Sequence, residues 1–228
     1  MNSTTKTTKS FRTGLLLGSM LAGVLLAGPA AAWSTDEGGF QAGAFLVRGR
    51  LIDVIPQTSS SSISVIGGDV NVTSTLAPEV DFSYFVTDNL SAELIAATTR
   101  HTMSASNTAI GPVQVGTTWV LPPALTLQWH FLPKETFSPY VGAGINYTFF
   151  YDSKGPGSGS PITRVSMQNN VGAVIQAGVD WNISGRLYAN VDVKQIFLNT
   201  QASLNSGAIV AKTALNPTVV GAGMGWRF

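Results

Sequence analysis

Cysteine is absent from the 228 residues, and charged residues are scarce. Without cysteine the chain has no disulfide and no thiolate ligand for a metal. Charged residues make up 11% of the chain, about half the proportion usual in soluble domains. No cluster of Lys and Arg forms a basic patch, so nothing indicates a nucleic-acid partner. No nucleophile motif and no metal-ligand spacing is present, so we expect no cofactor, no metal and no enzymatic activity.

The first 32 residues have the three parts of a secretory signal peptide. Lys6, Lys9 and Arg12 form a positive region, residues 14–27 are apolar but too short to span a membrane, and small residues at 29–32 supply a cleavage site. We expect removal of residues 1–32 and a mature single domain of residues 33–228; the alternative is an uncleaved anchor. The removed part holds three basic and no acidic residues, so the mature chain has 10 basic and 12 acidic residues and a net charge of −2.

The last ten residues alternate strictly between two kinds of side chain. One face of an extended strand would carry Val220, Ala222, Met224, Trp226 and Phe228, and the other would carry three glycines and Arg227. An apolar face that finishes with aromatic rings is typical of a transmembrane barrel strand, whose outer face meets hydrocarbon and whose ends meet the membrane interface. After residue 32 no apolar run is long enough for a transmembrane helix. The pattern therefore favours a membrane β-barrel.

Seven earlier segments share this two-residue period and bring the predicted number of strands to eight. They are residues 39–54, 70–86, a strand beginning at Leu90, 113–131, 137–152, 168–181 and 186–201. Short turns at 87–89, 132–136 and 182–185 alternate with longer polar segments at 58–64, 101–111, 153–161 and 202–212, which we interpret as loops. Short periplasmic turns and long extracellular loops are typical of outer-membrane barrels. The sequence thus predicts an all-β fold, an eight-stranded antiparallel transmembrane β-barrel.

The two faces of each strand differ in a way that sets their orientation. One face is apolar, and the other carries Glu, Asp, Gln, Asn or Gly. We assign the apolar face to lipid and the mixed face to the lumen. A soluble, lipocalin-like barrel with apolar side chains inside is the alternative.

Several segments resemble the OmpW family of small outer-membrane proteins. They are residues 85–98, 121–125, 139–148, 176–180 and the Gly-Trp-Arg-Phe sequence at 225–228. The resemblance implies an eight-stranded barrel in the bacterial outer membrane, surrounded by outer-membrane lipid, with a narrow and largely hydrophobic lumen. It also implies that small hydrophobic solutes cross the membrane with the protein's help, without identifying them. As family members do, the chain would meet the secretion machinery and the barrel-insertion machinery, which would read the alternating series ending in Trp226 and Phe228.

Inward residues divide into two groups by their distance from the short turns. Nearer the turns lie polar residues that we expect to form a hydrogen-bonded floor: Glu93, Gln128, His130, Asp180, Asp192, Lys194 and Arg227. Farther away lie apolar residues that we expect to line a ligand chamber: Ile95, Ala97, Phe150, Val174, Ile196 and Leu198. Charges in a narrow lumen need partners, and Lys194 and Arg227 are the cations expected to balance Glu79, Asp81, Glu93, Asp180 and Asp192. A structural plug is favoured over a chemical role for these groups.

The expected function is passive conduction of small hydrophobic molecules through the apolar upper lumen. The alternative is a structural or receptor barrel with a closed lumen and functional extracellular loops. Pro122 and Pro123 interrupt the fourth predicted strand, and proline lacks the N–H that ladder pairing needs. These prolines mark either a lateral exit from the chamber into the bilayer or the end of the lipid-embedded part of that strand.

Overall fold

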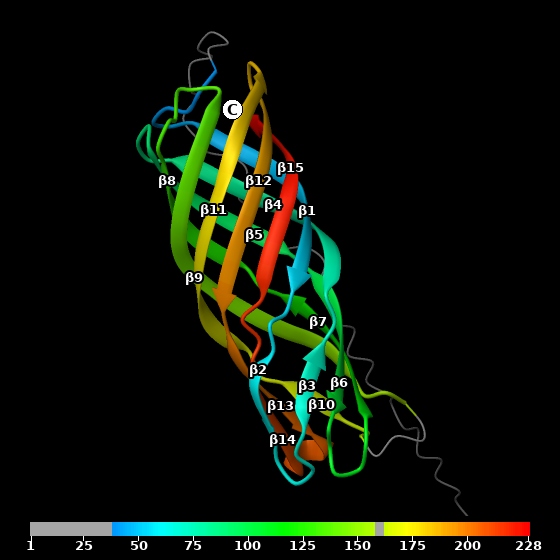
Figure 1. Ribbon diagram of the computed structural model, residues 1–228. Coiled ribbons are helices and arrows are strands. Elements are labelled where there is room, and N and C mark those ends of the chain that lie inside the picture. The colour runs from blue at the N-terminus through cyan, green and yellow to red at the C-terminus, as the bar shows by residue number, and fades with distance from the viewer. Residues whose placement is uncertain (1–37, 158–161) are drawn as a thin grey trace, which may run out of the picture. The chain divides into compact units, whose positions relative to one another are not determined.

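The computed structural model describes residues 38–157 and 162–228 (Figure 1). The expected signal peptide, residues 1–32, lies outside the described residues. Within the described part, regular structure is almost entirely strand, and the one helical element is the 3₁₀ turn η1, Asn205–Gly207. None of the described residues belongs to a helix that is long and apolar enough to cross a membrane.

Eight strands form a closed antiparallel barrel. In order around the wall they are β1 (Phe45–Ile55), β4 (Thr75–Phe85), β5 (Leu90–Ala97), β8 (Ala124–His130), β9 (Phe137–Lys154), β11 (Asn170–Ser184), β12 (Leu187–Phe197) and β15 (Thr218–Arg227). Pairing of β9 with β11, and of β15 with β1, closes the sheet on itself. The eight-stranded antiparallel barrel predicted from the two-residue period is confirmed.

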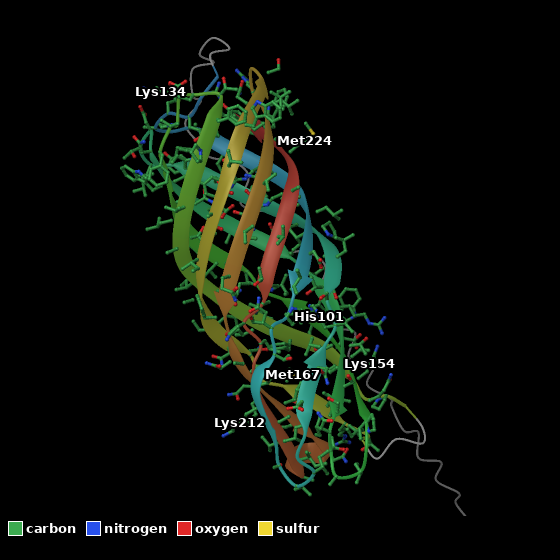
Figure 2. The ribbon with its side chains drawn as sticks, viewed as in Figure 1. His101, Lys134, Lys154, Met167, Lys212 and Met224 are labelled. Carbon is green, nitrogen blue, oxygen red and sulfur yellow. The ribbon has the colours of Figure 1, made fainter. Side chains whose placement is uncertain are left out.

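Shorter strands continue the wall beyond one rim. There β6 (Thr99–Ser106) pairs with β7 (Val113–Leu121) and with β3 (Asp69–Val72), and β7 pairs with the end of β9. A separate sheet has the order β10 (Val165–Met167), β13 (Asn199–Leu204), β14 (Ile209–Ala214) and β2 (Ser59–Ile63). We call this side the loop end and the side of the short turns the turn end. Lys212 in β14 and Lys134, between β8 and β9, lie toward these opposite ends (Figure 2).

The loops predicted at residues 101–111 and 202–212 are wrong for much of their length, because β6, β13 and β14 occupy them. Although these two segments are rich in polar residues, buried apolar residues alternate with polar ones in part of each. Met103, Ala202 and Leu204 are buried, and each stands between polar neighbours in the chain. Thr is favoured in strands, so a composition rich in Ser and Thr does not by itself indicate a loop.

Large apolar side chains cover the outer face of the barrel strands. Leu94, Leu127 and Val191 are all exposed, whereas the side chains that precede and follow them are buried inside the barrel. Ile145 is exposed as well, between Gly144 and the buried Asn146. A continuous exposed apolar surface on a soluble protein would drive association. The observed faces agree with the assignment of the apolar face to lipid and contradict the lipocalin-like alternative.

The wall is interrupted at Pro122 and Pro123 without a change of register. Ile95 pairs with Ala124 on one side of the prolines, and Thr99 pairs with Val120 on the other. The three residues between these pairs on each strand therefore face one another, yet no ladder pair joins them in this described seam.

On their other side the two prolines are hydrogen-bonded to β9. The backbone N–H of Tyr147 donates to the Pro123 carbonyl at 3.0 Å. Asn146 Nδ2 donates to the carbonyls of Pro122 and Pro123 at 3.0 and 3.1 Å. Pro122 and Pro123 have no ladder partner in β9 either, but these three hydrogen bonds bridge that gap. The prolines consequently weaken chiefly the seam between β5–β6 and β8–β7.

The residues before Phe45 close the turn end. A strand is predicted over 39–54, but β1 begins later; of the residues before it, Phe40 and Ala44 have buried side chains, whereas residues 41–43 are exposed. Phe40 is buried, and its ring stacks on Phe85 and Tyr188 with centroid distances of 4.4 and 4.7 Å. These stacked rings fill the lumen at the turn end with apolar side chains.

Candidate functional site

The barrel interior has three levels between the turn end and the loop end. The plug consists of Phe40, Ala44, Leu46, Phe85 and Tyr188. The network consists of Arg48, Arg50, Glu79, Asp81, Glu93, Asp180, Asp192 and Lys194. The chamber consists of Ile52, Ala77, Ile95, Ala97, Ala124, Val174, Ile196, Leu198 and Val219, with Val54, Phe150 and Leu215 packed against them.

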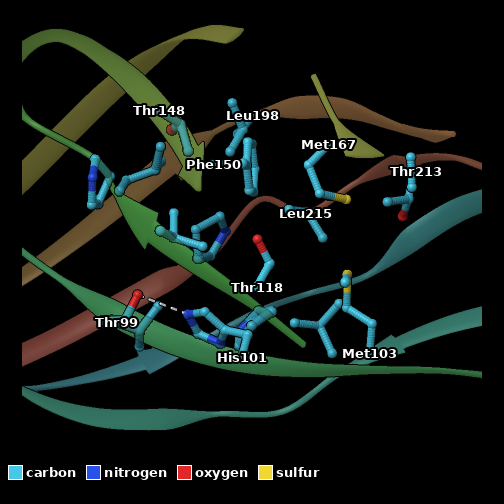
Figure 3. Close-up of a pocket in the computed structure, with 18 of the residues that line it drawn as sticks. Thr99, His101, Met103, Thr118, Thr148, Phe150, Met167, Leu198, Thr213 and Leu215 are labelled. Atoms are coloured by element: carbon cyan, nitrogen blue, oxygen red, sulfur yellow. Dashed lines mark hydrogen bonds between the residues drawn. The ribbon is translucent and has the colours of Figure 1, made fainter. Parts of the chain in front are cut away.

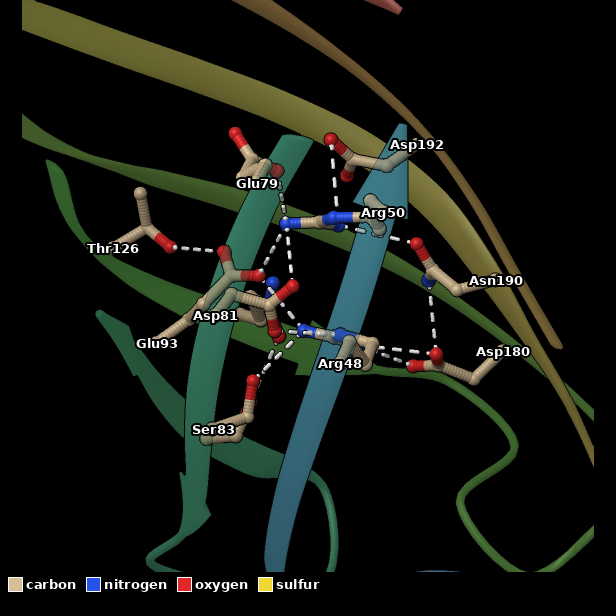
Figure 4. A network of polar contacts seen from close by, with 12 residues as sticks. Arg48, Arg50, Glu79, Asp81, Ser83, Glu93, Thr126, Asp180, Asn190 and Asp192 are labelled. Atoms are coloured by element: carbon tan, nitrogen blue, oxygen red, sulfur yellow. Dashed lines mark hydrogen bonds and ion pairs between the residues drawn. The ribbon is translucent and has the colours of Figure 1, made fainter. Parts of the chain in front are cut away.

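Arg48 stands at the centre of the network (Figure 4) and is completely buried. Its Nε lies 2.7 Å from Asp81 Oδ1, its Nη2 lies 2.7 Å from Glu93 Oε1, and its Nη1 lies 2.9 Å from Asp180 Oδ2. Nη2 also donates to Ser83 Oγ at 2.8 Å. One guanidinium from β1 thereby joins carboxylates from β4, β5 and β11, as its fork of five donors allows.

Arg50 and Lys194 complete the network. Arg50 Nη2 lies 2.8 Å from both Glu79 Oε1 and Asp81 Oδ2. Lys194 Nζ lies 3.1 Å from Glu79 Oε1 and 2.6 Å from Asp192 Oδ1. These charged groups are buried away from water, and burying any one of them without its partners would cost several kcal/mol of free energy, on the order of 3–5. At this level the network therefore fills the barrel with buried cations and carboxylates that stabilise one another.

The expectation that Arg227 balances the lumen carboxylates is wrong. Arg227 is half-buried and donates a hydrogen bond to the carbonyl of Gly39. Its predicted role belongs to Arg48 and Arg50, which sequence reasoning missed. A signal was present, because the two arginines alternate on the face of β1 whose other members are apolar. Two arginines spaced two residues apart both face the lumen, where each needs a carboxylate as a partner.

Gln128 and His130 lie between the network and the plug. Ser91 Oγ donates to Gln128 Oε1 at 3.1 Å and lies 3.3 Å from His130 Nε2. His130 Nδ1 lies 3.1 Å from Ser138 Oγ, and its ring meets Phe40 edge-on at 5.3 Å. The turn-end half of the lumen is thus filled with paired polar groups and rings.

The residues predicted to line a chamber lie together. Ile95, Ala97, Val174, Ile196 and Leu198 belong to one buried cluster, and Phe150 packs against it. They come from β5, β9, β11, β12 and the residue between β12 and β13. The cluster also contains residues that sequence reasoning did not identify, namely Ile52, Ala77, Ala124 and Val219.

A narrow cavity of about 100 Å³ continues from the chamber toward the loop end (Figure 3). Its lining extends into a second apolar cluster that includes Met103, Val115 and Leu204. In the other direction the lining reaches Glu79 and Lys194 of the network. A mostly apolar path therefore leads into the barrel and stops at an ion pair.

The interrupted seam lies beside this path. Pro122 lines the cavity, as do Ala97 and Ala124 from either side of the seam. On the outer surface, Thr98 Oγ1 lies 2.5 Å from the hydroxyl of Tyr151 in β9. Thr98 Oγ1 also donates to the Val120 carbonyl at 3.4 Å, so two hydrogen bonds of this side chain span the seam.

Among the described residues outside the barrel strands, Asp88, Lys134 and His101 have shifted pKa values. The hydrogen bond between the exposed Lys134 and Asp88 lowers the pKa of Asp88 and raises the pKa of Lys134. Burial lowers the pKa of His101 in β6, and a hydrogen bond to the Thr73 carbonyl opposes that shift only partly. His101 is therefore neutral at pH 7. Among the residues that the structure describes, no group of three or more His, Asp or Glu is placed to hold a metal ion.

Comparison with known proteins agrees with this architecture. The model of the OmpW family matches residues 41–228. The uncharacterized outer-membrane protein y4mB of Sinorhizobium fredii is 40% identical over 185 residues, which cover 80% of this chain and 79% of that protein. Outer membrane protein W of Vibrio cholerae is 31% identical over 195 residues, which cover 82% of this chain and 90% of that protein.

A solved structure shares the fold. The crystal structure of the outer membrane protein OprG from Pseudomonas aeruginosa superposes with a TM-score of 0.77 at 26% identity, and covers 83% of this chain and 98% of that chain. The strand order, the outward apolar face and the match over nearly all described residues agree with one another. The chain belongs to the OmpW family of outer-membrane β-barrels.

Proposed function

We propose that the barrel passively conducts small hydrophobic molecules from the loop end into the chamber and releases them sideways into the bilayer beside Pro122 and Pro123. The observation that carries this proposal is the course of the cavity. Its lining is mostly apolar from the second cluster to the chamber, with Thr99 and His101 between the two, and it ends at the ion pair of Glu79 and Lys194.

Straight passage through the turn end is unfavourable for an apolar solute. Such a solute would have to separate buried ion pairs, and leaving those charges without partners costs several kcal/mol, on the order of 3–5. Beyond the network it would meet the stacked rings of Phe40, Phe85 and Tyr188. The solute therefore needs another way out of the chamber.

The interrupted seam offers that way out at the level of the chamber. Ala97 and Ala124 present small side chains there, and the ladder pairs between residues 96–98 and 121–123 are missing. Separating the strands at this point breaks no backbone ladder bonds. The hydrogen bonds of Thr98 to Tyr151 and to the Val120 carbonyl are the contacts that would open.

Two variants test the route by uptake of a hydrophobic solute into cells. Ile196→Asp places a carboxylate in the chamber wall, where Ile196 is 7% exposed. We expect uptake to fall by at least about tenfold, the factor that corresponds to 1.4 kcal/mol, because a buried charge strongly disfavours an apolar neighbour. Pro122→Val with Pro123→Val restores N–H donors to the seam, so it should slow uptake as well.

Ile196→Val is the matched control, because it keeps the wall apolar and should transport normally. Heat-modifiability of each variant reports whether the barrel has folded. Wild-type uptake by the double valine variant would rule out lateral exit at this seam, while leaving the chamber intact as a hypothesis. If hydrophobic uptake does not depend on the protein at all, conduction is wrong and the closed structural or receptor barrel is the better reading.

The C-terminal residues carry a separate proposal, that Trp226 and Phe228 end the signal for barrel insertion. Phe228 is 66% exposed, and its N–H donates to the Phe45 carbonyl at 2.7 Å, next to the closing seam. Deleting Phe228 should lower the amount of heat-modifiable barrel in the outer membrane, with Phe228→Tyr as a control that keeps the ring. Normal assembly of the shortened chain would contradict the proposal.

A further inference from the structure

A band of polar side chains separates the two apolar clusters of the cavity. Along the inward row of β5 and β6, Glu93 belongs to the network and Ile95 to the chamber, whereas Thr99 and His101 are polar again before Met103 begins the second cluster. All these side chains are buried, and the cavity passes Thr99 and His101 (Figure 3). A solute moving toward the chamber therefore passes these two groups.

The hydrogen bonds of His101 determine which atoms carry hydrogens. Its Nδ1 lies 2.7 Å from the Thr73 carbonyl oxygen, which can only accept, so Nδ1 carries the hydrogen. Burial keeps the imidazole neutral by lowering the pKa of His101. Nε2 consequently has a free lone pair, and it accepts the hydroxyl hydrogen of Thr99, whose Oγ1 lies 2.9 Å away. The Thr99 oxygen then presents lone pairs but no hydrogen to a further partner.

We infer that Thr99 is a specificity-determining residue that binds the hydroxyl group of an uncharged, slender and otherwise apolar solute. The inference rests on the proposed conduction of hydrophobic molecules and names their chemical class. An alcohol can donate its hydrogen to Thr99 Oγ1 while its chain lies against the apolar clusters. A ketone has no hydrogen to donate, and a carboxylate would bring a charge to a neutral imidazole in an apolar surrounding.

The test measures binding to the purified barrel in lipid nanodiscs, with 1-octanol and 2-octanone as probes of similar size. Methyl NMR of labelled isoleucine and threonine reports occupancy at Ile196 and Thr99, and partition into empty nanodiscs is subtracted. We expect 1-octanol to bind about threefold to tenfold more tightly than 2-octanone, the range that one neutral hydrogen bond supplies. Thr99→Val, which keeps the shape and removes the hydroxyl, should abolish that difference.

Two further variants make the result specific. Thr99→Ser keeps the hydroxyl and should retain the preference for the alcohol. Thr102→Val changes a neighbouring threonine that does not line the cavity, so it should behave as the wild type. Equal binding of the two probes to the wild type, or an unchanged preference in Thr99→Val, overturns the inference and leaves conduction standing. If neither probe shifts the Ile196 methyl signal, the inference and the proposed conduction both fail.

Discussion

Replacing Arg48 with methionine is expected to lower the free energy of unfolding of the barrel by about 3–5 kcal/mol. Methionine keeps an unbranched apolar stem of similar length to the aliphatic part of arginine but removes the guanidinium. Asp81, Glu93 and Asp180 would each lose a bond of 2.7–2.9 Å while remaining buried. Asp81 and Glu93 would keep their contacts to Arg50, whereas Asp180 would keep only the hydrogen bond from Asn190. A buried carboxylate without a cation is far less stable than one in water, so the loss comes chiefly from the partners left behind.

Urea titration of the barrel in lipid vesicles, followed by heat-modifiability, measures this loss. Lys134→Met is the matched control, because Lys134 also pairs with a carboxylate, Asp88 at 2.8 Å, but at an exposed site. Exposed ion pairs contribute little to stability, so the control should resemble the wild type. Equal stability of Arg48→Met and Lys134→Met would show that the network does not hold the barrel strands together.

Replacing Ile145 with arginine is expected to destabilise the barrel by about 2–4 kcal/mol, the cost of a charge near the bilayer midplane. Ile145 is 61% exposed on the outer face of β9, where it pairs with Leu125 on one side and Ala173 on the other. An arginine there meets hydrocarbon in place of water. The same titration in vesicles measures the effect.

Ile110→Arg separates the effect of lipid from that of the substitution itself. Ile110 is 58% exposed, close to the value for Ile145, but it lies between β6 and β7, beyond the barrel strands. Exposed substitutions in water usually change stability by less than about 0.5 kcal/mol. If both variants lose the same stability, the outer face of β9 does not face lipid and the assignment of faces is wrong.

Much of the candidate site could be predicted from the sequence because the alternation of side chains within one strand is enough to identify its lumen-facing residues. Ile95 and Ala97 stand at alternate positions on β5, and Ile196 and the Leu198 that follows the end of β12 continue one alternation in the sequence. Their distance from a short turn gives their level in the barrel. The pairing of charges could not be read in this way. Arg227 has the right face of its strand for a lumen cation, yet the bonds to the carboxylates come from other strands.

The eight barrel strands, their antiparallel order and the lipid-facing side of each strand can be read from the amino-acid sequence, because they follow from local alternation and from short turns between neighbours. Which side chains meet inside the barrel follows from the closed fold. The tilt and stagger of the strands set which inward residues share a level, and they bring Arg48 to Asp180 across 132 positions of the chain. They also bring β8 so close to Gly144 that a Cβ there would lie 2.0 Å from the Leu125 carbonyl oxygen. Such contacts depend on how all the strands of the closed barrel are arranged, so the sequence of a single strand does not predict them.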